Sequence, residues 1–243
     1  MASNISVFLR FSDGTFGSLR STVTESSTAF GQYTEITTEG GDLNQTSGVS
    51  AGQAFPGKTC THAFAKVATD SVQTGAFVAA YFENTDGSIS VPIQGAGQPA
   101  SEMPLLKKPV RMTTGVVCKA ALQDVADAVQ IATLAVYCGS GKSDVFAALA
   151  VDDTPTAMVN PQGKTIGQAL DGQVIQCAYA TYAATNGLDD NDGGVNALYI
   201  ENSAGVLKAM YPINKGNGES AVPYMSYPVR IVQNDTLTVT ASL

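Results

Sequence analysis

Few residues in this sequence have the types and spacing that chemistry would need, and the first candidates form a glycine-rich run. Gly139-Ser140-Gly141-Lys142-Ser143 resembles the end of a phosphate-binding loop. That loop also needs a glycine five positions before Gly141, where this chain has Val136, and it leads from a strand into a helix. Residues 144–147 have the pattern of another strand. The sequence therefore favours a hairpin turn over a nucleotide site.

A second candidate is the acidic run Asp189-Asp190-Asn191-Asp192-Gly193-Gly194. Clustered carboxylates are ligands for hard cations such as Ca2+. The helix–loop–helix calcium pattern would place its first ligand at Leu188, which excludes that pattern. An irregular calcium site made by Asp189, Asp190 and Asp192 remains the alternative to a solvated turn between two strands, which the sequence favours.

Catalytic groups are sparse. His62 is the single histidine of the chain, and no Gly-x-Ser-x-Gly motif accompanies it. One imidazole and four scattered cysteines supply too few of the nitrogen and sulfur ligands that zinc prefers. The carboxylates of Glu83 and Glu201 recur in the two halves of the chain, but each stands directly before a turn residue, which favours a structural role. We therefore predict a protein that is not an enzyme and that needs no cofactor.

The elements that must position these residues have the pattern of strands. Short apolar, β-branched and aromatic segments end at turn signals throughout the chain, as in many-stranded sandwiches and barrels. The clearest segments are 5–11, 77–82, 198–200 and 237–241. Only 120–129 has apolar residues at helical spacing, and it is the one helix we consider. The expected fold class is all-β.

Three sequence blocks recur in the same order in the second half of the chain. Their spacing drifts slightly, as small insertions in loops between equivalent strands would allow. Gly52-Gln53-Ala54-Phe55 returns as Gly167-Gln168-Ala169-Leu170, Tyr81-Phe82-Glu83-Asn84 as Tyr199-Ile200-Glu201-Asn202, and Pro109-Val110-Arg111 as Pro228-Val229-Arg230. The turn Asp13-Gly14 aligns in the same way with Ser140-Gly141. We infer an internal duplication.

The duplication predicts two tandem β modules, 1–124 and 125–243, with a seam at Val125-Ala126-Asp127 and an approximate two-fold or rotational pseudo-symmetry. Each module is expected to be a sandwich or barrel, with a jelly-roll-like arrangement as one option. The first module is longer within 22–48, a polar stretch that we expect to form an extended loop or arm. Three pairs occupy equivalent structural positions: Glu83 and Glu201, Asn84 and Asn202, and Arg111 and Arg230, whose guanidinium groups should pin a loop or the module interface.

Composition excludes several classes of function. The chain has 13 Lys and Arg against 21 Asp and Glu, a net charge of −8, whereas a general nucleic-acid binder needs a basic surface. No segment has the roughly 18 apolar residues of a membrane span, and the N-terminus lacks the pattern of a signal peptide. Cys60, Cys118, Cys138 and Cys177 form no Cys-x-x-Cys pair, so we expect buried free thiols.

The share of charged residues favours assembly. Only 14% of the residues are charged, against roughly 25% in an ordinary soluble domain, and surfaces poor in charge are typical of subunit interfaces. A duplicated module also presents two similar contact surfaces per chain. We predict a self-assembling structural protein, and we favour a virion component (a capsid, decoration or tail-tube subunit) that assembles in the host cytoplasm with itself and other virion proteins, without direct contact to nucleic acid. The alternative is a non-enzymatic module that binds a glycan or a cell surface through its loops.

Overall fold

Nearly all of the regular secondary structure in the described residues is β-strand, which confirms the predicted fold class. The computed structural model describes residues 2–24, 33–38, 47–68, 75–95, 105–124, 130–150, 155–184, 194–212 and 228–242. Sixteen strands and two short helices lie within these residues. The strands form sandwiches of antiparallel sheets, two sheets in each half of the chain.

The first eight strands make two sheets that face each other. Sheet A has the order β2-β1-β4-β7, and sheet B has the order β3-β8-β5-β6. A short parallel pairing between β4 and β6 joins the two sheets along one edge. The elements are β1 (Ala2–Phe11), β2 (Phe16–Thr24), β3 (Thr34–Ile36), α1 (Ala51–Ala54), β4 (Thr59–Ala68), β5 (Gly75–Glu83), β6 (Ile89–Gly95), β7 (Leu105–Arg111) and β8 (Val117–Asp124).

The last eight strands repeat this arrangement. Sheet C has the order β10-β9-β12-β15 and sheet D the order β11-β16-β13-β14. When β9 to β16 are matched in chain order to β1 to β8, sheet C repeats sheet A and sheet D repeats sheet B. The elements are β9 (Gln130–Cys138), β10 (Ser143–Ala150), β11 (Thr156–Ala157), α2 (Ile166–Leu170), β12 (Val174–Ala184), β13 (Gly194–Glu201), β14 (Leu207–Pro212), β15 (Val229–Arg230) and β16 (Thr236–Ser242). We call β1 to β8 the first module and β9 to β16 the second module.

The irregularities of the strands are repeated as well as their order. A β-bulge places one extra residue on a strand and is usually a built-in feature of a fold. The bulge at Thr61 in β4 returns at Gln176 in β12. The extra residues Val78 in β5 and Ser90 in β6 likewise return as Asn196 in β13 and Lys208 in β14. Matching bulges support the duplication independently of the sequence blocks.

Each short helix lies against the loop that precedes the last strand of its module. The backbone N–H of Gly52 in α1 donates to the carbonyl oxygen of Val116 at 2.8 Å, and that of Gly167 in α2 donates to Asp235 at 3.2 Å. A Cβ atom on either glycine would collide with backbone carbonyl oxygens of that loop. Close packing of helix and loop therefore requires the glycine that begins the repeated Gly-Gln-Ala block.

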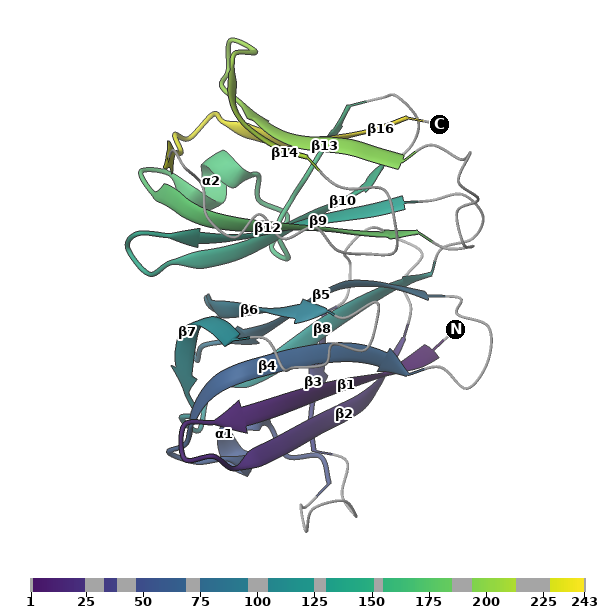
Figure 1. The fold of residues 1–243 in the computed structure, drawn as a ribbon, viewed down its shortest axis with the longest axis vertical. Helices are drawn as coiled ribbons and strands as arrows, with labels where there is room; N and C mark the ends of the chain where they lie inside the picture. Colours follow the sequence, from purple (N-terminus) through teal and green to yellow (C-terminus); the bar gives the residue numbers. More distant parts are fainter. Residues whose placement is uncertain are drawn as a thin grey trace.

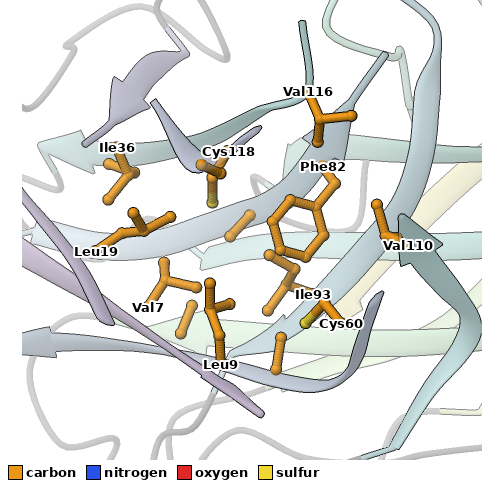
Figure 2. Close-up of a cluster of buried hydrophobic side chains, with 14 of the residues drawn as sticks. Val7, Leu9, Leu19, Ile36, Cys60, Phe82, Ile93, Val110, Val116 and Cys118 are labelled. Atoms are coloured by element: carbon orange, nitrogen blue, oxygen red, sulfur yellow. The ribbon is translucent and has the colours of Figure 1, made fainter. Parts of the chain in front are cut away.

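Two separate apolar cores hold the two sandwiches together. Strands contribute alternate residues to each core because successive side chains point to opposite faces of a sheet. Figure 2 shows part of the first core, which includes Val7, Leu9, Leu19, Ile36, Phe82 and Ile93. The second core includes Leu134, Val136, Phe146, Met158, Leu198 and Ile200. Each module therefore buries its own interior.

The helix predicted for 120–129 is wrong in its described part. Residues 120–124 belong to β8, which pairs along its whole length with β5. Cys118 and Ala120 are buried while Lys119 between them is half-buried, which is strand alternation. Residues 125–129, including the predicted seam, lie outside the described residues.

The predicted arm at 22–48 contains a strand of the sandwich. Residues 34–36 form β3, which pairs with β8, and Ile36 is fully buried in the first core. The backbone N–H of Arg20 donates to Thr37 at 2.8 Å, which holds the segment beside β2. An extended arm is therefore wrong for 33–38, while 25–32 and 39–46 lie outside the described residues.

The four sheets are stacked in the order A, B, C, D, from the purple strands at the bottom of Figure 1 to the green and yellow strands at the top. Strands β5 and β6 of sheet B pack on β9, β10 and β12 of sheet C. Because sheet C corresponds to sheet A and not to sheet B, this contact joins two different faces of the repeated module. The modules are thus related head to tail, which excludes an isologous two-fold between them.

Candidate functional site: docked and exposed sheet faces

The glycine-rich run forms a hairpin turn, as the sequence predicts. Gly141 has a φ of 85°, and its N–H donates to the carbonyl oxygen of Cys138 at 2.9 Å. Gly14 makes the equivalent turn, with a φ of 82° and a bond of 3.0 Å to Phe11. The turn at Gly141 connects β9 directly to β10, so no helix follows to bind a phosphate group.

The other candidates from the sequence do not come together into a site. Asp189, Asp190 and Asp192 lie outside the described residues, and the described residues contain no group of three side chains that could hold a metal ion. His62 lies half-buried on β4, and its Nδ1 is 2.9 Å from the Oγ1 of Thr61. Its counterpart Cys177 is buried rather than half-buried, because the second module has this face covered.

The repeated residues occupy equivalent places. The N–H groups of Asn84 and Asn202 close matching turns by donating to Ser88 at 2.9 Å and to Val206 at 3.0 Å. Glu83, one residue before the first turn, pairs with Lys119 at 2.8 Å; Glu201 stands in the same place before the second turn.

The repeated arginines also match. Arg111 lies opposite Thr59 on β4, and Arg230 lies opposite Val174 on β12. Both side chains are exposed. The pinning role expected for the two guanidinium groups stays a prediction.

The four cysteines are free and buried, as the sequence predicts. Burial raises the pKa of Cys60 to about 12 and that of Cys138 to about 11. Burial also raises the pKa of the thiols of Cys118 and Cys177. Thiols in this state are inert toward thiol reagents at neutral pH.

The two modules dock on each other through the faces of sheets B and C. Tyr137 projects from β9 and packs against the core of the first module, where its hydroxyl donates to the carbonyl oxygen of Pro92 at 3.3 Å. Tyr81 projects from β5 and is 1% exposed. At the rim, the Nζ of Lys108 donates to the carbonyl oxygen of Gly141 at 3.5 Å. The faces are joined by aromatic anchors at the centre and a polar contact at the edge, as in interfaces between subunits.

The electrostatics of this contact follow from the exclusion of water. The rings of Tyr81 and Tyr33 pack with centroids 5.1 Å apart, and burial raises the pKa of both phenols, with the charge of Asp144 as a further cause. Burial also raises the pKa of Asp144, which accepts a hydrogen bond from the Nδ2 of Asn160 at 3.0 Å. Burial in an environment of low polarity is therefore the main cause of all three shifts.

The outer face of sheet C is built for close contact. Its buried side chains are uncharged and mostly small, and sheet B covers them. They include Thr133, Ser143, Val145, Ala147 and Cys177. Sequence reasoning did not identify this face, because strand alternation predicts outward-facing residues without showing which of them another module covers.

The outer face of sheet A is the counterpart of that face and is exposed. Phe8 stacks on Phe64 with ring centroids 5.2 Å apart, and the guanidinium of Arg10 lies 5.9 Å from the ring centre of Phe16. Phe16 is 64% exposed and Phe8 is 36% exposed. Arg10 occupies the strand position that Tyr137 occupies in sheet C.

The outer face of sheet D is the counterpart of the docked face of sheet B. Tyr199 takes the place of Tyr81 and pairs in register with Met210, which takes the place of Pro92. Met210 is 55% exposed, and Leu207 on the same strand is 50% exposed. The structure therefore has two kinds of outer face. Sheets B and C are docked on each other, whereas their counterparts, sheets D and A, are exposed.

Comparison with known proteins adds no relative. No family model matches this chain, and neither a curated protein nor a solved structure matches it significantly. Within the described residues, neither helix has the length and apolar character needed to cross a membrane.

Proposed function

We propose that this protein is a self-assembling structural protein and a component of a virion, as a capsid, decoration or tail-tube subunit. The observation that carries the proposal is the docking of sheet B on sheet C, in which two copies of one module already associate through broad sheet faces. A module that associates with its own duplicate has the kind of surface from which a shell or tube is built. Its partners are then copies of itself and other virion proteins.

The strand order supports the proposal through fold-level analogy. In an eight-stranded jelly roll, the last strand lies between the first and the third strand of one sheet. Here β1 lies between β2 and β4, so β1 takes the place of a last strand that has moved to the front of the chain. We propose that both modules are jelly rolls of this shifted kind, an architecture that viral capsid domains share with lectins.

Light scattering coupled to size exclusion, followed by negative-stain microscopy, tests this function. We expect the purified chain to form oligomers whose size grows with concentration and whose images show rings, sheets or tubes. A chain that stays monomeric at every concentration would contradict the proposal.

The second candidate, a module that binds glycans, is favoured by the exposed rings of Phe16 and Phe8 on sheet A. Aromatic faces stack on sugar rings, and lectin domains also use jelly rolls. A monomeric chain that binds immobilised glycans, with binding lost in Phe16→Ala, would support this candidate over assembly.

A further inference from the structure

We propose that sheet D of one chain docks on sheet A of the next chain, in the way that sheet B docks on sheet C within a chain. This inference rests on the proposed self-assembly and deepens it by naming the two surfaces that meet. The partner that covers the exposed face of sheet A or of sheet D is then a second copy of this chain.

The internal contact supplies the template. Sheets B and D have the same strand order and carry the same bulge at Ser90 and Lys208, so their outer faces share one strand arrangement. Sheets A and C share the bulge at Thr61 and Gln176 in the same way. Since sheet B fits sheet C, the backbone of sheet D matches that of sheet A.

The exposed apolar side chains gather on the two faces that this docking would cover. Six large apolar side chains are well exposed in the described residues, and four of them lie on these faces. Phe8 and Phe16 lie on sheet A, and Leu207 and Met210 lie on sheet D. The other two, Val206 and Val232, lie between strands. Apolar side chains concentrated on faces of this kind mark protein contacts.

Charge also favours a second copy as the occupant. The four strands of sheet A contain no Asp or Glu. Apart from Lys107 and Lys108 of β7, which lie beside sheet C, they hold four of the chain's 13 lysines and arginines: Arg10, Arg20, Lys66 and Arg111. Because the whole chain has a net charge of −8, the rest of the chain taken together is acidic, while the strands of sheet D hold one Glu and one Lys. A copy of this chain therefore attracts sheet A electrostatically.

The positions that should meet follow from the internal pair Tyr137 and Pro92. Their counterparts are Arg10 on sheet A and Met210 on sheet D. Two separate preparations, Arg10→Cys and Met210→Cys, are treated with a short bis-maleimide alone and after mixing. We expect a cross-linked dimer only in the mixture, because the contact joins unlike faces and the native thiols are buried.

A pair of surface variants provides a matched control. Met210→Lys should raise the concentration at which assembly begins by on the order of tenfold, since it places a positive charge opposite Arg10 on the basic sheet A. Val206→Lys should leave that concentration unchanged, because the counterpart of Val206, Ser88, stays exposed beside the internal contact. Both side chains are exposed, so both variants should fold like the wild type.

Three outcomes would overturn the inference, and they are distinguishable. Assembly with no cross-link in the mixture and no effect of Met210→Lys would reject these faces while leaving self-assembly intact. A wild-type chain that never assembles would reject the proposed function itself. Binding of a fluorescent single-stranded oligothymidylate that is lost in Phe64→Ala, without cross-linking in the mixture, would assign the basic aromatic face of sheet A to nucleic acid instead.

Discussion

At the scale of single residues, the recurrence of Gly-Gln-Ala has a steric cause. A Cβ at Gly52 would lie 1.8 Å from the carbonyl oxygen of Thr113, and a Cβ at Gly167 would lie 2.4 Å from that of Gln233. Real Cβ atoms do not approach backbone oxygens so closely, so the helix and the loop would have to separate. The same glycine was kept in both copies because the same contact is made in both.

Substitution of these glycines should therefore destabilise the chain. Gly→Ala in a helix ordinarily stabilises by about 0.5–1 kcal/mol, but Gly52→Ala and Gly167→Ala should each lower the free energy of unfolding by about 2–3 kcal/mol. Gly139→Ala is the control, since its Cβ would meet only the movable end of the Gln176 side chain. Urea denaturation measures all three. If Gly139→Ala lowered the free energy of unfolding as much as Gly167→Ala, the steric explanation would be contradicted.

Asp144 should give the stability a measurable dependence on pH. Burial raises the pKa of this carboxyl, so the folded chain holds the proton more tightly than the unfolded chain. The free energy of unfolding should then fall as pH rises from about 4 toward neutral. Asp144→Asn should flatten this fall, because an amide does not titrate. Urea denaturation at pH 5 and pH 7 measures the free energy of unfolding. An equal change of this free energy between the two pH values in the wild type and in Asp144→Asn would rule out Asp144 as the cause.

At the scale of elements, strands with strong turn signals could be predicted from the sequence and short elements could not. The turns at Gly14 and Gly141 were visible because left-handed glycine ends a strand in a recognisable way. Strand β3 and helices α1 and α2 are too short to show a period. The predicted helix at 120–129 failed in its described part because Leu122, which stands at helical spacing from Val125 in the sequence, belongs to a strand that β5 holds in place.

The role of β3 can be tested directly. Ile36 is fully buried in the first core, so Ile36→Ala should lower the free energy of unfolding by about 2–4 kcal/mol. Its exposed neighbour on the same strand, Glu35, provides the control, and Glu35→Ala should change stability by less than about 0.5 kcal/mol. Both values come from urea denaturation. If Ile36→Ala were as mild as Glu35→Ala, residues 33–38 would be an arm after all.

At the scale of the whole molecule, the duplication could be predicted and the docking of its copies could not. Core positions and turns kept recognisable residues because both copies need the same interior. The outer faces diverged: Arg10 stands where the other copy has Tyr137, and Met210 where the other has Pro92. Whether an outward-facing residue is exposed or docked depends on which sheet lies against it. The sequence does not show this, so the docked and exposed faces could be identified only from the structure.

Tyr137 should couple the unfolding of the two modules. Its ring packs against the core of the first module from a strand of the second, so the loss of either module removes its contacts. With the docked faces intact, we expect the wild type to unfold in one transition. Tyr137→Ala should remove about 2–3 kcal/mol of coupling and split unfolding into two steps, one per module.

Arg10→Ala, at the same strand position on the exposed face of sheet A, should leave the single transition in place. Calorimetry on monomeric samples distinguishes the cases: a single transition in Tyr137→Ala, or two in the wild type, would show that the internal contact is too weak to serve as a template for assembly.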